Sequence, residues 1–187
     1  MASFLGLGNY YRRLIAHFAE YAELLYKNLL ELKVPSSEVL EMAFAKLKDE
    51  LCDGVAVMLP NADKPFVVET YASIHVIVAV LLQREGEEEY PTHFYSQALN
   101  APQRKYSTYE RELVAVVKAC DAFRVYLQCR ELTLRTDHAA LSAIFNSPLS
   151  STGRVAKWLL APQQFRFTVN YINGEENVAA DKLSPIP

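Results

Sequence analysis

Cysteine is scarce in this sequence. Its 187 residues include three, Cys52, Cys120 and Cys129. The number is odd, and the spacing matches no metal-binding motif. A disulfide-stabilised secreted scaffold is therefore excluded, and we expect free thiols in a reducing, intracellular compartment.

Long hydrophobic runs are also missing. Charged residues interrupt every apolar segment before it reaches the length that spans a bilayer, so we expect no membrane partner. The beginning has no secretory pattern, because Arg12 and Arg13 follow the apolar residues instead of preceding them. The sequence stops abruptly after Pro185-Ile-Pro187, and we expect it to be a piece of a longer protein.

Neither sign of charge is in large excess. The 19 lysines and arginines oppose 22 aspartates and glutamates, which gives a net charge of -3. This balance argues against broad attraction to nucleic acid, although a local basic face is compatible with it. Hydrophobic residues make up 51% of the chain, enough for the core of one substantial domain.

Helical periodicity marks the first fifty residues. Apolar residues recur at helical spacing from Phe4 to about Leu32, which predicts an amphipathic helix or helix pair. We favour a packed helical cap over a free partner-binding helix. A second helix is expected from Glu38 to Leu51, capped by Ser36 or Ser37.

Strand signals dominate the next segment. Residues 66–72 and 75–84 are rich in β-branched side chains and predict two strands joined by a tight turn near Ser73. Residues 86–89 predict a hairpin turn, and residues 90–96 predict a third strand. The three strands would form an antiparallel meander.

Helices and strands alternate in the second half. Ser107 and Glu110 form a capping box that predicts the start of a long amphipathic helix. Further elements are expected as a strand at 131–136, helices at 139–145 and 154–160, a strand at 165–172 and a last helical turn capped by Asn177. This order predicts an α/β fold with a five-stranded mixed sheet flanked by helices.

Three acidic residues could meet in this topology. Glu112 lies one turn inside the capped helix, Asp137 ends the fourth strand and Asp181 lies in the terminal helix. Open α/β sheets place ligands at the carboxyl ends of their strands, and magnesium prefers hard oxygen donors. A pair of such ions can activate water in phosphodiester cleavage. Each residue also has a purely structural explanation. Glu112 could be a solvent-facing helix residue, Asp137 an N-cap for the following helix and Asp181 a surface charge.

Several segments resemble the RNase H region of Ty3/gypsy-type LTR-retrotransposon reverse transcriptases. In chain order they are Phe4-Leu-Gly-Leu-Gly-Asn-Tyr-Tyr-Arg-Arg13, Ala43-Phe-Ala-Lys-Leu-Lys48, Val57-Met-Leu-Pro-Asn61, Tyr106-Ser-Thr-Tyr-Glu-Arg-Glu-Leu-Val-Ala115, Leu134-Arg-Thr-Asp-His138 and Tyr171-Ile-Asn-Gly-Glu-Glu-Asn-Val-Ala-Ala-Asp-Lys-Leu-Ser184. The resemblance implies an RNase H-like domain over residues 61–187, with residues 1–60 as a helical connector like the one that follows the polymerase thumb. It also implies that Glu112, Asp137 and Asp181 occupy three of four catalytic metal-ligand positions for Mg2+ or Mn2+.

The fourth of these positions departs from the family. Its first strand normally reads Thr-Asp-Ala-Ser, whereas this sequence has Thr70-Tyr71-Ala72-Ser73. The phenol of Tyr71 is neutral at physiological pH and cannot replace a shared anionic ligand. Glu69 points to the same face but is displaced by roughly 6.6 Å along the strand. We therefore expect the metal site to be impaired and no metal ion to be bound.

Two glycines usual in the family's second strand are also replaced, by Val76 and Val78. Glycine within a strand often marks a close approach of backbone or ligand, so valine indicates either lost substrate access or simple stabilisation of the sheet. Pro185 stands where the family usually has arginine.

Basic residues give a weaker signal. Arg104, Lys105 and Arg111 cluster around the start of the capped helix, and Arg154 and Lys157 lie on another. They could contact phosphates of an RNA–DNA hybrid or other nucleic acid. Scattered cations in a net-acidic domain are more often solubilising.

Two functions remain open at this point. The favoured one is a catalytically inactive, host-domesticated derivative of a retroelement that serves as a scaffold or interaction module beside other domains of a longer polyprotein. The alternative is an active ribonuclease H that cuts RNA in RNA–DNA hybrids with two Mg2+ ions. Tyr71 decides between them.

Overall fold

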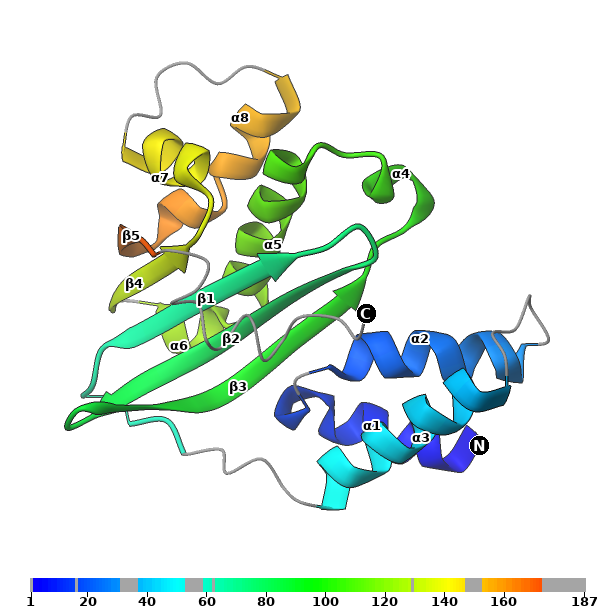
Figure 1. Cartoon of the computed structure of the whole chain (residues 1–187). Coiled ribbons are helices and arrows are strands. Elements are labelled where there is room, and N and C mark those ends of the chain that lie inside the picture. The colour runs from blue at the N-terminus through cyan, green and yellow to red at the C-terminus, as the bar shows by residue number, and fades with distance from the viewer. Residues whose placement is uncertain are drawn as a thin grey trace.

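A computed structural model describes residues 2–15, 17–30, 37–52, 59–61, 63–128, 130–146 and 153–172. Five strands form one sheet in the order β3-β2-β1-β4-β5 (Figure 1). They are β1 (Phe66–Ala72), β2 (Val76–Glu85), β3 (Glu88–Ala98), β4 (Glu131–Thr136) and β5 (Arg166–Tyr171). β1, β2 and β3 pair antiparallel, while β4 pairs parallel with β1 and β5. The expected α/β fold with a mixed sheet is confirmed.

Ser73 shapes the turn between β1 and β2. Its backbone N–H donates to the carbonyl oxygen of Val76 at 2.8 Å. Its hydroxyl oxygen accepts from the N–H groups of His75 at 3.1 Å and Val76 at 3.0 Å. Serine favours turns because its side chain can bond nearby backbone groups in this way. The tight turn predicted near Ser73 is confirmed.

The second hairpin is longer than predicted. Gly86 adopts a positive φ of 66° in the turn, a conformation that costs glycine little. Backbone pairing then runs from Glu85 opposite Glu88 to Val76 opposite Ala98. β3 therefore extends beyond residues 90–96 at both ends, because its polar ends pair with β2 through backbone groups alone.

β2 is buried on both faces of the sheet. Ala79 and Leu81 belong to the main hydrophobic core together with side chains of α5 (Thr108–Ala122). On the other face, alternate residues of β2 form a separate apolar cluster with Phe94 of β3. A central strand covered on both sides reads as a continuous apolar run, which explains the β-branched composition of this segment.

Helices of the second half cover one face of the sheet (Figure 1). α5 packs on β1 and β2, α7 (Ala139–Asn146) packs on β4 and β5, and α8 (Gly153–Leu159) packs beside α5. The capping box is confirmed: the Ser107 hydroxyl accepts from the Glu110 N–H at 3.2 Å, and the Glu110 carboxylate accepts from the Ser107 N–H at 3.0 Å. Short helical turns α4 (Ala101–Arg104), α6 (Arg124–Leu127) and η3 (Pro162–Gln164) complete this part.

The first helices form a body of their own beside β3. α1 (Ala2–Tyr11), η1 (Arg12–Leu14), α2 (Phe18–Leu29) and α3 (Ser37–Cys52) enclose a cluster that includes Leu5, Leu25 and Leu47. α2 and η1 pack on β3, and the Ala19 N–H donates to the Ser96 hydroxyl at 3.0 Å. A packed helical cap is therefore confirmed, while the boundary near residue 60 stays a prediction.

The structure also bears on two expectations from composition, those about free thiols and about membrane-spanning segments. Cys120 is a buried free thiol, and burial raises its pKa to about 12. The side chains of Cys52 and Cys129 lie outside the described part. None of the helices in the described ranges is long and apolar enough to cross a membrane.

Candidate metal and nucleic-acid site

Glu112 is held at the junction of α5 and β1. The capping box fixes the start of α5, which places Glu112 one turn into the helix. Its side chain is buried, with 5% of the residue's surface exposed. One carboxylate oxygen accepts a hydrogen bond from the backbone N–H of Ala72 at 3.1 Å, directly after Tyr71. The other oxygen is buried and has no hydrogen-bond partner among the residues that the structure describes. A carboxylate with one unsatisfied buried oxygen is available to a cation or a proton.

Asp137 reaches the same edge of the sheet. It follows the last residue of β4, and β4 runs parallel to β1, so both strands end on the side where Glu112 lies. Burial, followed by the negative charge of Asp137, raises the pKa of Glu112 to about 8, against the opposing effects of the Ala72 hydrogen bond and Arg111. The structure thus brings Glu112 and Asp137 together, and Glu112 holds a proton at neutral pH.

Asp181 lies outside the described residues. Across the described ranges, no group of three or more His, Cys, Asp and Glu side chains is placed to hold a metal ion. The metal-ligand roles of Glu112, Asp137 and Asp181 therefore stay predictions.

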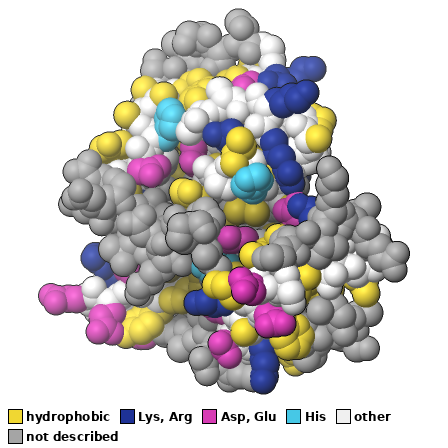
Figure 2. All heavy atoms as spheres, turned by 45° about the vertical axis from the view of Figure 1, so that its right-hand side comes forward, with side chains coloured by type: hydrophobic (Ala, Val, Ile, Leu, Met, Phe, Trp, Pro, Cys, Tyr) yellow, Lys and Arg dark blue, Asp and Glu magenta, His cyan; other side chains and the backbone are white. Residues whose placement is uncertain are grey.

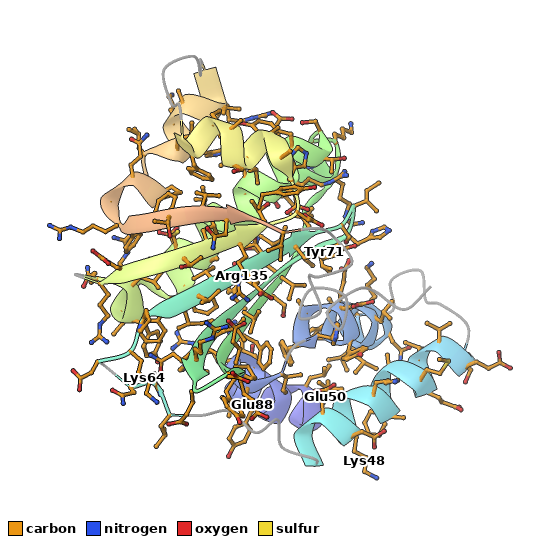
Figure 3. The ribbon with its side chains drawn as sticks, turned by 60° about the vertical axis from the view of Figure 1, so that its left-hand side comes forward. Lys48, Glu50, Lys64, Tyr71, Glu88 and Arg135 are labelled. Carbon is orange, nitrogen blue, oxygen red and sulfur yellow. The ribbon has the colours of Figure 1, made fainter. Side chains whose placement is uncertain are left out.

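Tyr71 lies near the end of β1 (Figure 3). It pairs with Val78 of β2, and its side chain is half-buried. Its neighbour along the chain, Ala72, supplies the N–H that Glu112 accepts. In sequence, Tyr71 thus directly precedes the residue that bonds Glu112, at the position where the family pattern expects an aspartate.

Glu69 is engaged elsewhere. Its carboxylate accepts from the guanidinium of Arg135 on β4 at 2.8 Å, and the same guanidinium bonds both carboxylate oxygens of Glu89 on β3 at 2.6 and 2.5 Å. Glu69 is 4% exposed. Burial raises the pKa of Glu69, opposed by the hydrogen bond from Arg135, whereas that guanidinium lowers the pKa of Glu89. Glu69 is therefore part of an ion-pair network and does not replace the missing ligand.

Arg135 was not singled out by sequence reasoning. Its neighbours in the network come from strands that are distant in the sequence, and the network depends on the parallel register that sets Arg135 opposite Glu69. The sequence did contain one signal for this network. Arg135 lies within a predicted strand, and an arginine in a buried strand requires partners of opposite charge.

Val76 and Val78 fill the second apolar cluster. They are 3% and 2% exposed and pack with Val80, Leu82 and Phe94 on the face opposite α5. This packing supports their role in stabilising the sheet. The loss of substrate access stays a prediction.

The predicted basic cluster is largely satisfied within the chain. The Arg104 guanidinium donates to the Leu99 carbonyl oxygen and to Glu23, both at 2.8 Å. Arg111 donates to the Tyr106 carbonyl oxygen at 3.2 Å. Lys105 is exposed. Guanidiniums that are already bonded have fewer donors left for a phosphate.

In the second basic pair, Arg154 and Lys157, the arginine is again bonded within the chain and the lysine is exposed. Arg154 pairs with Glu110 and lies over the rings of Tyr106 and Trp158, at 4.2 and 5.0 Å from their centroids. Lys157 is exposed. Figure 2 shows basic and acidic side chains interspersed over one face of the molecule. Binding of nucleic acid by these residues stays a prediction.

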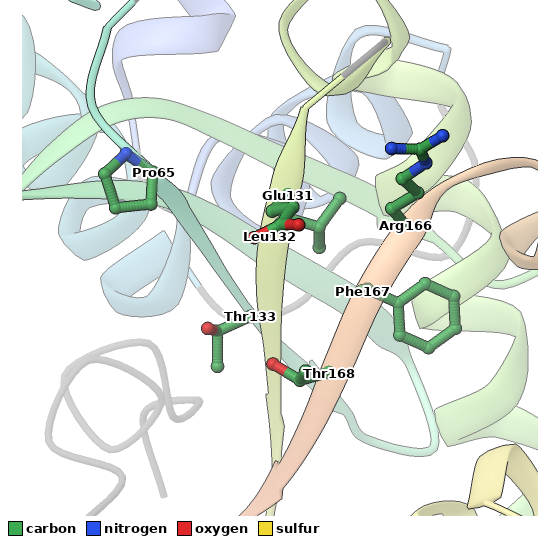
Figure 4. Close-up of a pocket in the computed structure, with 7 residues that line it drawn as sticks. All are labelled: Pro65, Glu131, Leu132, Thr133, Arg166, Phe167 and Thr168. Atoms are coloured by element: carbon green, nitrogen blue, oxygen red, sulfur yellow. The ribbon is translucent and has the colours of Figure 1, made fainter.

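A cavity at one end of the sheet lies away from the carboxylates. Its volume is about 360 Å³, and it is lined by Pro65 and by the first residues of β4 and β5 (Figure 4). Because β1, β4 and β5 are parallel, this end of the sheet is opposite the edge that carries Glu112 and Asp137. The cavity is therefore no part of the candidate site.

Comparison with known families gives a match over more than half of the chain. A family model described as "RNase H-like domain found in reverse transcriptase" matches residues 61–165. The "Retrovirus-related Pol polyprotein from transposon 297" of Drosophila melanogaster is 35% identical over 187 residues, covering 98% of this chain and 17% of the polyprotein. The polyprotein from transposon gypsy of the same species is 34% identical over 196 residues, covering 97% and 18%.

A yeast relative gives the same result. The "Transposon Tf2-3 polyprotein" of Schizosaccharomyces pombe is 31% identical over 192 residues, covering 100% of this chain and 14% of the polyprotein. The chain thus spans less than a fifth of the length of each of these relatives.

Solved structures of foamy viral protease-reverse transcriptase share the fold. The form in complex with double-stranded DNA has a TM-score of 0.73 at 18% identity, covering 91% of this chain and 31% of that chain. The form in complex with an RNA/DNA hybrid has a TM-score of 0.71 at 19% identity, covering 100% and 25%.

Proposed function

Because this chain belongs to the RNase H-like domains found in reverse transcriptase, with Ty3/gypsy-type polyproteins as homologues, we propose that it is a retroelement-derived module that has lost two-metal hydrolysis. The observation that carries the proposal is Tyr71, which directly precedes Ala72, the backbone partner of Glu112, and occupies the position of an expected aspartate. The fold is retained, and the reaction is not.

The donor groups argue against a pair of divalent ions. Two-metal hydrolysis needs anionic oxygens that bridge both ions, and Mg2+ demands near-ideal octahedral oxygen coordination. Among the residues described, Glu112 and Asp137 supply carboxylates here, and position 71 has a tyrosine instead of a third carboxylate. Glu69, the nearest acidic residue on β1, is bonded to Arg135. These groups do not fit a two-ion centre, so no catalytic step is assigned to one.

The retained features favour a scaffold. Val76 and Val78 close the face opposite α5 with apolar side chains, and the first helices pack against β3. Both features stabilise the fold without needing a substrate. We infer that the partners are other domains of a longer polyprotein, since the relatives are polyproteins more than five times as long as the part they share with this chain.

Weak binding of an RNA–DNA hybrid is proposed as a residual property. A related structure holds an RNA/DNA hybrid, and Lys105 and Lys157 are exposed and available to phosphates. Such binding should weaken steeply between about 50 and 200 mM salt, because it depends on release of counterions.

Hybrid cleavage tests the proposal. The 187-residue chain is incubated with a labelled RNA–DNA hybrid and Mg2+ or Mn2+, beside an Asp137→Asn variant that keeps the size of the side chain and removes its charge. We expect no cleavage by either protein. Equal cleavage by both would indicate a contaminating nuclease, which repurification removes. Cleavage that Asp137→Asn abolishes would establish the alternative, an active ribonuclease H, and overturn the scaffold proposal.

A further inference from the structure

A second pocket lies between the first helices and the sheet, away from the carboxylates. Its volume is about 130 Å³, and its lining includes Arg12, Arg13, His93, Tyr95, Ala122 and Phe123. The residues come from η1, β3 and the end of α5, so the pocket exists only where the helical body meets the domain. Ten residues of α5 separate this end from Glu112, which is roughly 15 Å at the α-helical rise.

The two arginines at this pocket are free. Neither Arg12 nor Arg13 forms an ion pair or side-chain hydrogen bond with any residue in the described ranges, and both are exposed. By contrast, Arg104, Arg124 and Arg135 all have carboxylate partners. Adjacent guanidiniums repel each other, and an anion between them removes that cost.

His93 adds a third donor. Its Nε2 lies 2.9 Å from the Tyr126 hydroxyl, and its Nδ1 is buried and has no hydrogen-bond partner within the described part of the chain. With the proton on Nδ1, the ring accepts from Tyr126 and still has one N–H to donate. Burial lowers the pKa of His93, and the positive charge of Arg13 lowers it further.

The surroundings favour an anion over a cation. Phe94 and Phe123, both buried, form an apolar part of the lining, where charge interactions are stronger than in water. Asp121, whose charge reaches the neighbouring Tyr95, is paired with Arg124 at 3.0 Å and is not free to neutralise Arg12 or Arg13.

We propose that this pocket, formed by Arg12, Arg13 and His93, binds a phosphate group. Planar guanidiniums match the oxygens of phosphate in paired hydrogen bonds, and the imidazole N–H supplies a further one. The phosphate belongs either to a nucleic-acid backbone or to a free phosphoester. The site does not depend on metal ions or on the carboxylates, so its test is independent of the test of hydrolysis.

Titration of the 187-residue chain with inorganic phosphate at constant ionic strength, followed by NMR of the His93 ring and by calorimetry, tests the site. We expect saturable binding, and we expect Arg12→Gln and Arg13→Gln each to weaken it about tenfold, the effect of losing a charged hydrogen bond. The matched control is Arg166→Gln, an exposed arginine at the cavity on β4 and β5, which should leave binding unchanged. Urea unfolding of each variant checks that the fold is intact.

Competition identifies the source of the phosphate. Displacement by an RNA–DNA hybrid assigns the site to a nucleic-acid backbone, and displacement by a nucleoside monophosphate alone assigns it to a free phosphoester. Absence of saturation, equal weakening by Arg166→Gln, or displacement by neither competitor would reduce the finding to an adventitious ion only and overturn the proposal.

Discussion

Replacement of Glu112 by glutamine should make the protein more stable at alkaline pH. The pKa of Glu112 is about 8 in the folded chain against 4.5 for an ordinary glutamate. The folded state therefore holds this proton more tightly than the unfolded state does. The contribution of Glu112 to stability is complete below pH 4.5 and is lost as the pH rises to about 8. At about 1.4 kcal/mol per pH unit, the loss over this range is roughly 4–5 kcal/mol.

Glu112→Gln removes this pH dependence and retains an oxygen to accept from the Ala72 N–H. Urea unfolding of the variant and the parent chain at pH 5, 6, 7 and 8 measures the effect. Between pH 5 and pH 8, the unfolding free energy of the parent chain should fall by roughly 4 kcal/mol relative to that of the variant. Glu87→Gln, on the exposed β2–β3 turn, is the control and should follow the parent chain. If the unfolding free energies of Glu112→Gln and the parent chain change with pH in parallel, the inference that folded Glu112 holds a proton is refuted.

Three further outcomes follow from the same contacts. Asp137→Asn removes a negative charge that raises the pKa of Glu112, so the loss of stability with rising pH should be smaller and should end at a lower pH in the same urea series. Arg135→Met leaves the buried carboxylate of Glu69 unpaired and should lower the unfolding free energy by roughly 3–5 kcal/mol, whereas a change under about 1 kcal/mol would show that the network is not stabilising. Ser107→Ala removes the cap of α5 and should cost about 1 kcal/mol, measured by thermal or urea unfolding.

Local signals in the sequence predicted most of the fold. The capping box at Ser107 marked the start of α5, and the break between two β-branched runs marked the turn near Ser73, where the serine hydroxyl bonds the backbone. Both depend on contacts within three residues, which the sequence displays directly. The ends of β3 were less predictable, because backbone pairing with β2 sets them and side-chain composition does not.

Contacts across the sheet could not be predicted in the same way. The sequence identified Glu112 and Asp137 as candidates, but their proximity depends on the parallel register of β1 and β4. The same register creates the pair of Glu69 with Arg135, which no local pattern reveals. Arg12 and His93 are separated by eighty residues and meet only because the first helices pack on β3.

The affinity of the site for divalent cations tests the central claim, that Tyr71 has replaced a metal ligand. Calorimetric titration with Mg2+ and with Mn2+ is made on the parent chain, on Tyr71→Asp and on Tyr71→Phe. The Tyr71→Phe control removes the hydroxyl without adding a charge. We predict that Tyr71→Asp gains at least about tenfold in affinity, or about 1.4 kcal/mol, while Tyr71→Phe matches the parent chain. Tight binding by the parent chain, or no gain in Tyr71→Asp, would contradict the claim.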